Sequence, residues 1–136
     1  MNTLIILIVA SMLGMDLGSI RQEPNPEHRC DLAIENANTA VDTAKDAYSA
    51  GDGAKLQAAL DEVADSVDLA YESLAGEAHR NTRAFKKAEL QTGKLLRRLD
   101  GFRQVVDFDN REKVEKTHER VSAAHDNLLN GMMKKK

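Results

Sequence analysis

Apolar residues recur at steps of three and four in four successive segments of this 136-residue chain. That spacing places them along one face of an α-helix and leaves the polar residues on the other side. Each stripe repeats every seven residues, which favours helices that cross at shallow angles in a bundle. The sequence therefore predicts four amphipathic helices. Their inward stripes are Cys30, Ile34, Ala37, Val41, Ala44 and Tyr48; Leu56, Leu60, Val63, Val67, Ala70 and Leu74; Phe85, Ala88, Thr92, Leu95, Leu99, Phe102 and Val106; and Val114, Thr117, Val121, Ala124 and Leu128.

The fold predicted from this pattern is all-α, an antiparallel up-down-up-down four-helix bundle. The only prolines, Pro24 and Pro26, precede the first stripe, and a tight Gly51-Asp52-Gly53 connection separates the first two stripes. A connection that short makes the second helix run back along the first. The alternative is a set of tetratricopeptide-like helical hairpins, because Ala44–Asp52 reads A-K-D-A-Y-S-A-G-D, although no second copy follows at the expected period.

Capping residues predict the limits of the first two helices. Asn25 precedes Pro26, an arrangement typical of a helix N-terminus because proline's missing N–H is not needed there. We expect the first helix to end at Gly51, which can adopt a left-handed cap conformation. Asp52 is the expected N-cap of the second helix, which should stop near Gly76.

The limits of the last two helices follow from weaker signals. Asn81 or Thr82 is expected to cap the third helix, and Gly101 leaves open whether that helix is kinked or ends early. Asp109 begins a sequence that resembles a capping box for the fourth helix. Gly131 is expected to close this helix.

The N-terminus carries an unbroken apolar run from Leu4 to Met15. This run is shorter than the roughly 20 residues that span a bilayer, and its length fits the core of a secretory signal. Residues 1–19 are therefore predicted to be a signal peptide or an N-terminal anchor, with a periplasmic or secreted location. The remaining divisions predicted are a linker at 20–25, a helical bundle domain at 26–131 and a basic tail at 132–136.

Three phrases in the chain carry a resemblance. They are A-Y-E-S-L at Ala70–Leu74, L-L-R-R-L-D-G-F-R-Q at Leu95–Gln104 and H-D-N-L-L-N-G at His125–Gly131. With them the chain resembles a group of short, secreted, all-helical bacterial proteins of unassigned function. The resemblance implies the fold, export and a bacterial source, and it assigns no site residue.

Charge is unevenly distributed along the chain. Glu27 to Asp52 carries two basic and six acidic residues, Gly53 to Ala78 one and six, and His79 to Val106 eight and two. The basic third helix can pair with its acidic neighbours, or it can offer a face to an anionic partner. The candidate partner-binding residues, which share the outward side of this helix, are Arg80, Arg83, Lys87, Lys94 and Arg97.

Several kinds of partner fit such a face. An unknown protein or an anionic envelope component is expected, with transient contact to a membrane surface as a further possibility. Nucleic acid is not expected, since its binding usually adds aromatics that stack on bases or a groove-fitting motif, and Phe85 and Phe102 are needed for the core. Leu90 and Leu129 lie outside the inward stripes, so a homo-oligomer is conceivable through them.

Catalytic and metal-binding motifs are sparse. Glu115 and His118 have the E-x-x-H spacing of di-iron bundles, but there is no second copy, and we assign no metal site and no cofactor. No nucleophile motif or phosphate-binding loop occurs, so we do not expect an enzyme. Cys30, the single cysteine, is either packed and inert or links two chains.

The sequence thus favours an exported, non-catalytic helical-bundle protein with a binding or structural role. We expect that such a protein can contact an anionic partner through the basic face of the third helix. The alternative is a small metal or ligand carrier that uses the bundle core and the histidines of the fourth helix, His118 and His125.

Overall fold

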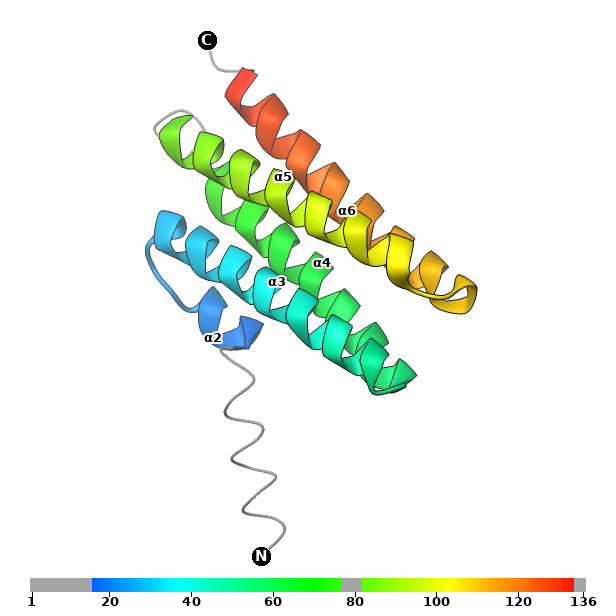
Figure 1. Cartoon of the computed structure of the whole chain (residues 1–136). Helices are drawn as coiled ribbons and strands as arrows, with labels where there is room; N and C mark the ends of the chain where they lie inside the picture. Colours follow the sequence, from blue (N-terminus) through cyan, green and yellow to red (C-terminus); the bar gives the residue numbers. More distant parts are fainter. Residues whose placement is uncertain (1–15, 77–81, 134–136) are drawn as a thin grey trace, which may run out of the picture.

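Helices make up all the regular structure in the part of the chain that the computed structural model describes, residues 16–76 and 82–133. A short helix precedes four long ones, as Figure 1 shows. This confirms the prediction of an all-α bundle. The helices are α2 (Leu17–Arg21), α3 (Pro26–Ser49), α4 (Gly53–Ala75), α5 (Thr82–Val105) and α6 (Phe108–Met133).

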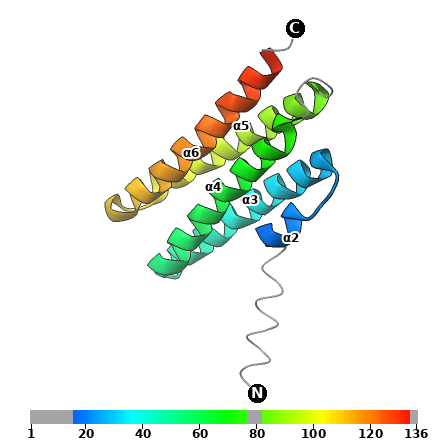
Figure 2. The ribbon, with the colours of Figure 1, turned by 180° about the vertical axis from the view of Figure 1, so that it is seen from behind.

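The four long helices form two antiparallel hairpins, α3–α4 and α5–α6, and helix direction alternates along the chain as predicted (Figures 1 and 2). The hairpins stack so that α5 lies on α3 and α6 lies on α4, while α4 and α5 touch much less. Lys87 of α5 pairs with Asp31 of α3, and Arg98 lower down α5 pairs with Asp42. Neighbours in different hairpins are therefore parallel.

The predicted caps of the first hairpin are confirmed. The side chain of Asn25 accepts hydrogen bonds from the backbone N–H groups of Glu27 and His28 at 2.9 and 3.1 Å. Asp52 accepts one from the N–H of Lys55 at 3.0 Å and so caps α4. Gly51 has a φ of 74°, which a residue with a side chain rarely adopts, and this turn reverses the chain.

The start of α6 differs from the prediction. Asp107, not Asp109, caps this helix, since its carboxylate accepts a hydrogen bond from the N–H of Asn110 at 3.0 Å. The N–H of Asp107 in turn donates to the hydroxyl of Tyr48 at 2.9 Å and ties the turn to α3. Gly101 lies inside an unbroken α5. Of the two predicted caps of α5, Thr82 is its first residue and Asn81 lies outside the described residues.

The end of α6 also differs. Gly131 was expected to close the helix, but α6 continues to Met133, so Met132 and Met133 are helical and do not belong to a tail. A Cβ atom at position 131 would lie 2.7 Å from the ring of Phe85. The glycine is therefore needed for close approach between helices rather than for termination. Residues 134–136 lie outside the described part.

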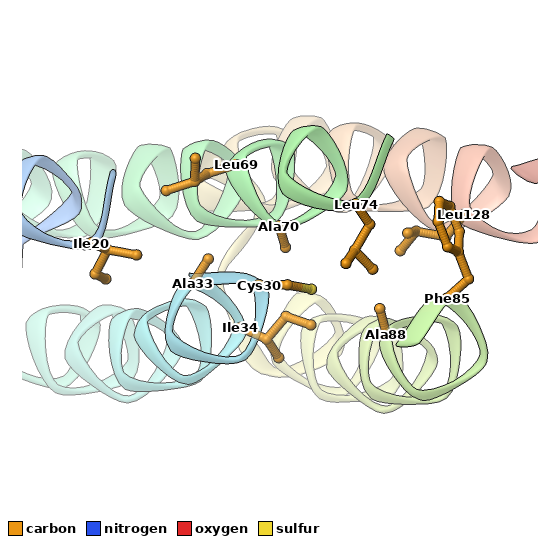
Figure 3. Packing of buried hydrophobic residues seen from close by; sticks show 10 residues of the cluster. All are labelled: Ile20, Cys30, Ala33, Ile34, Leu69, Ala70, Leu74, Phe85, Ala88 and Leu128. Carbon is orange, nitrogen blue, oxygen red and sulfur yellow. The ribbon is translucent and has the colours of Figure 1, made fainter. Parts of the chain in front are cut away.

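The segment predicted to be a linker at 20–25 is partly structured. Asp16 caps α2 through the N–H of Ser19 at 2.9 Å, and Ile20 is only 1% exposed. Ile20 packs in one cluster with Ala33 of α3 and Leu69 of α4, as Figure 3 shows. The linker assignment is thus wrong for Ile20 and Arg21, because an apolar side chain close to a hairpin is covered rather than left in solvent.

Residues 1–15 lie outside the described part, and the predicted signal peptide or anchor falls mostly on them. Within residues 16–76 and 82–133, none of the helices has the length and hydrophobicity that crossing a bilayer requires.

The core runs the length of the bundle between the two hairpins. Its members are the inward stripes predicted from the sequence, and all of them are buried except Tyr48, which is partly exposed. Alanines such as Ala37, Ala40 and Ala44 line α3, and their small side chains let α3 and α4 lie close together. The core therefore fixes which side of α5 faces outward.

Candidate functional site

The outward side of α5 carries a row of exposed basic residues. Its core-facing positions follow a step of three or four, so the intervening positions form one continuous outward strip. We use the name α5 strip for the exposed residues on this side, which are Arg83, Lys86, Lys87, Leu90, Lys94, Arg97, Gly101, Gln104 and Val105. Five of these residues are cations, and none carries a carboxylate.

The candidate residues differ in how far neighbours neutralise them. Lys87 lies 3.3 Å from the carboxylate of Asp31, and Lys86 lies 3.8 Å from that of Glu89. Arg83, Lys94 and Arg97 form no ion pair with any residue of 16–76 or 82–133. Their charges are left for solvent or a partner. Arg80, the fifth candidate, lies outside the described residues.

Arg98 follows Arg97 in sequence but belongs to a different surface. Its guanidinium turns toward α3, where it donates to the side-chain oxygen of Asn38 at 2.8 Å and pairs with Asp42. Arg103 likewise pairs with Asp100 one turn earlier on α5. Charge complementarity between helices, the alternative interpretation of the sequence, thus accounts for Arg98 and for Lys87. It leaves Arg83, Lys94 and Arg97 without an ion pair to a described residue.

Apolar side chains accompany these cations. Leu90 is 52% exposed in the middle of the α5 strip, and Val105 is 69% exposed at its end. Phe108, the first residue of α6, is 84% exposed just beyond Val105. Leu90 had been singled out from the sequence together with Leu129, whereas Val105 and Phe108 were missed. Both are apolar residues that lie outside the predicted inward stripes, and this position in the sequence could have identified them as exposed.

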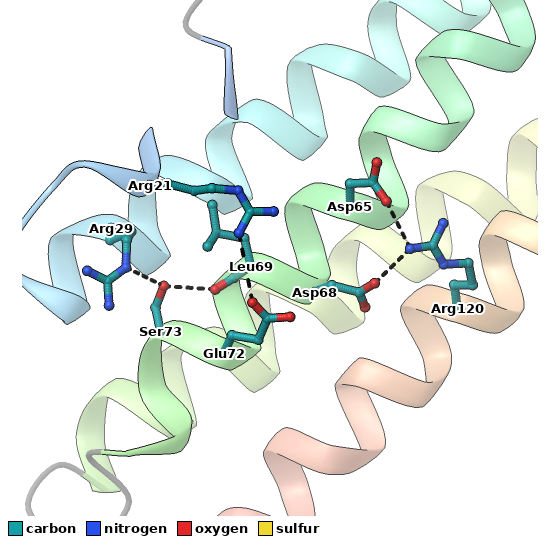
Figure 4. A network of polar contacts seen from close by, with 8 residues as sticks. All are labelled: Arg21, Arg29, Asp65, Asp68, Leu69, Glu72, Ser73 and Arg120. Atoms are coloured by element: carbon teal, nitrogen blue, oxygen red, sulfur yellow. Dashed lines mark hydrogen bonds and ion pairs between the residues drawn. The ribbon is translucent and has the colours of Figure 1, made fainter. Parts of the chain in front are cut away.

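The acidic side of the molecule is different, as Figure 4 shows. Arg120 of α6 bridges Asp65 and Asp68 of α4 at 2.9 and 2.7 Å. The hydrogen bonds from Asp68 and Asp65 raise the pKa of Arg120 above its ordinary value. Arg21 of α2 lies 4.0 Å from Glu72. The carboxylates of α4 are therefore partly neutralised by cations from elsewhere in the fold.

A polar contact between α5 and α6 joins three side chains. His125 Nδ1 and Thr92 Oγ1 share a hydrogen bond of 2.8 Å, and His125 Nε2 lies 3.5 Å from Glu89 Oε2. The order hydroxyl, imidazole, carboxylate resembles a nucleophilic triad. Thr92, however, is fully buried, and its hydroxyl also lies 2.9 Å from the carbonyl of Ala88. No substrate can reach that oxygen, so the contact holds the two helices together.

The structure brings no metal ligands together at the positions considered. Within the described residues, no three His, Cys, Asp or Glu side chains are placed to hold one metal ion. His125 is engaged with Thr92 and Glu89 across the hairpin rather than with His118. The alternative of a metal or ligand carrier stays a prediction, and no contact favours it.

Cys30 is packed inside the bundle. Its side chain is 3% exposed and lies among Ile34, Ala70 and Leu74 (Figure 3). Burial, followed by the nearby charge of Asp31, raises the pKa of the Cys30 thiol to about 12. The thiolate needed for disulfide exchange is thus disfavoured in the folded protein, which supports the inert alternative over a linkage between chains.

Fold and surface together define a class of molecule, a stack of two helical hairpins with a cationic, partly apolar strip on one helix. No protein-family model, curated protein or solved structure matches the chain.

Proposed function

We propose that this chain is an exported, non-catalytic helical-bundle protein that contacts an anionic partner through the α5 strip. The observation that carries the proposal is the set of five exposed cations with no exposed carboxylate among them. A surface of one sign raises the local concentration of ligands of the opposite sign and speeds their association.

The assignment to a binding or structural class rests on where the reactive groups lie. Cys30 is buried in an apolar cluster, and Thr92 is buried and shares a hydrogen bond with His125. The export part of the proposal is supported by the apolar run Leu4–Met15 and by the resemblance to secreted bacterial proteins. Fractionation of the source cells would test it, because a protein found only with the cytoplasmic fraction contradicts export.

Charge reversal tests the proposed contact. The variant carries Arg83→Glu, Lys94→Glu and Arg97→Glu, the three strip residues that make no ion pair with a described residue. The control carries Lys55→Glu, Arg111→Glu and Lys116→Glu, which are exposed cations elsewhere on the molecule. Both variants have the same net charge, so any difference between them reports the position of the charges rather than their sum.

The measurement is the salt concentration that elutes each protein from a dextran sulfate column. We expect the unmodified protein and the control to be retained. The strip variant should elute at much lower salt, because it has lost the cations whose attraction to the sulfate groups salt must screen. Equal elution of the two variants would show that the strip is not the contact surface.

A further inference from the structure

We infer that the anionic partner of the α5 strip is the surface of a lipid bilayer, on which the helix lies flat. This inference rests on the proposed function and names its ligand. In this arrangement the cations contact lipid phosphates, and the exposed apolar side chains enter the boundary between headgroups and acyl chains. Binding at a membrane surface grows with the apolar area that is buried and with the electrostatic attraction of Lys and Arg to anionic lipids.

The order of residues along the strip fits that arrangement. Leu90 has Lys87 about one turn before it and Lys94 about one turn after it, on the same side of the helix. Val105 lies fifteen residues beyond Leu90, about 22 Å along the axis at 1.5 Å per residue. Phe108 follows at the turn. Leu90 thus lies between cations, and Val105 and Phe108 are exposed beyond the last cation of the strip.

An acidic protein partner fits the same surface less well. Energetically important residues of protein interfaces cluster in a central, desolvated patch, whereas Leu90 and Val105 are far apart. A helical partner would also seek a groove. The groove beside the strip, between α3 and α5, is lined by Lys87 and Lys94 but also by Asp31 and Glu35. Those carboxylates would repel an acidic helix, while a flat surface would meet only the ridge of α5.

Vesicle binding tests this inference. The full chain and its variants are sedimented with vesicles of phosphatidylglycerol and phosphatidylcholine in equal parts, and with vesicles of phosphatidylcholine alone. We expect binding only to the anionic vesicles. The strip variant Arg83→Glu, Lys94→Glu, Arg97→Glu should bind at least about a hundredfold more weakly, because each cation contributes about fivefold near such a surface and each glutamate adds repulsion. The control with Lys55, Arg111 and Lys116 reversed should lose much less.

Two further variants report on the apolar residues. Leu90→Gln, Val105→Gln and Phe108→Gln together should weaken binding to anionic vesicles about tenfold, because apolar burial adds to the electrostatic attraction. The chain contains no tryptophan, so Phe108→Trp supplies a single fluorescent reporter at the turn. We expect its emission to shift to shorter wavelength when anionic vesicles are added.

The outcomes separate the inference from the function on which it rests. Salt-sensitive retention on dextran sulfate without vesicle binding would overturn the membrane inference and leave the proposed function standing, with a polymer or acidic protein as partner. Vesicle binding without a tryptophan shift, and unaffected by the three glutamines, would overturn it as well. If the unmodified protein neither is retained on dextran sulfate nor binds anionic vesicles, the proposed function itself is contradicted.

Discussion

The two hairpins of the bundle have similar lengths but differ in how much of their surface is buried. The first hairpin, α3–α4, packs against α5 and α6 on one side, and the short α2 covers part of its other side near Ala33 and Leu69. The second, α5–α6, is covered on one side only. Helix α4 buries eleven residues, whereas α6, its parallel neighbour, buries five. All the large exposed hydrophobic residues of the described chain, Leu90, Val105, Phe108, Leu129 and Met133, belong to the second hairpin.

Polar contacts follow the same division. In the first hairpin the buried amide of Asn36 donates to Ser66 at 2.9 Å and to Glu62 at 2.7 Å, and these bonds link α3 to α4. Arg29 donates to Ser73 on the same pair of helices at 2.8 Å (Figure 4). In the second hairpin the α5 strip keeps cations that no described residue pairs. The comparison teaches that the first hairpin holds more of the buried residues, whereas the second carries the large exposed apolar residues and the cations of the α5 strip that lack an ion pair.

Thiol labelling should show the widest contrast between the hairpins. We expect Cys30 in the folded protein to react with Ellman's reagent at least about a thousandfold more slowly than in the unfolded chain, because reaction requires opening of the core. A Cys30→Ala, Leu90→Cys variant moves the only thiol to the α5 strip, where it should react at once. Rapid labelling of Cys30 in the folded protein would mean that the first hairpin opens easily.

The labelling rate of Cys30 should also depend on pH in the alkaline range. Because the folded-state pKa of Cys30 is about 12, against 9.0 for an unperturbed thiol, the protonated thiol is favoured in the folded protein. Its contribution to stability is complete below pH 9 and is lost as pH rises toward 12. Labelling of Cys30 should accelerate across that window, more steeply than the labelling of the unfolded chain.

Truncation of one leucine in each hairpin should lower the free energy of unfolding by amounts that differ by a few kcal/mol. Leu60 is fully buried in α4, so Leu60→Ala should lower the free energy of unfolding by about 2–5 kcal/mol through lost burial and a cavity. Leu90→Ala removes the same atoms from an exposed site and should change it by less than about 0.5 kcal/mol. Urea denaturation followed by circular dichroism measures both. Similar losses for the two would show that Leu90 is covered in solution, for instance by a second copy of the chain.

Two glycines within the second hairpin give the smallest expected effects, and these have opposite signs. Gly101→Ala should stabilise the protein by up to about 1 kcal/mol, because a Cβ there meets open space and alanine favours a helix. Gly131→Ala should destabilise it, since the added Cβ would lie 2.7 Å from Phe85 and one of the two must move. Thermal melts compare the pair. A stabilising Gly131→Ala would place α6 further from Phe85 than described.

Local signals in the sequence reached most of the fold. The inward stripes, the caps at Asn25 and Asp52 and the turn at Gly51 all depend on residues near one another in the chain, and the structure confirms them. The errors fall where a distant contact decides. Ile20 is covered by α3 and α4, Gly131 is required by Phe85, and Asp107 is held by Tyr48. A local pattern does not carry that information.

The candidate site divides in the same way. The sequence placed Arg83, Lys87, Lys94 and Arg97 on the outward side of one helix, because periodicity alone sets which side faces the core. It did not separate Lys87, which faces Asp31, from Arg83, Lys94 and Arg97, whose charges no described residue pairs. That distinction depends on which helix lies beside α5.

The sequence by itself therefore determined that the chain is helical, which face of each long helix is buried and where the basic residues gather. These follow from the 3.6-residue period and from the chemistry of helix ends. Only the tertiary structure decided that the hairpins stack with parallel neighbours, that α2 packs on the first hairpin and that Arg83, Lys94 and Arg97 of the α5 strip have no ion pair with a described residue. A stripe of apolar residues requires a cover, but it does not specify which helix provides it, since the hydrophobic effect is non-directional.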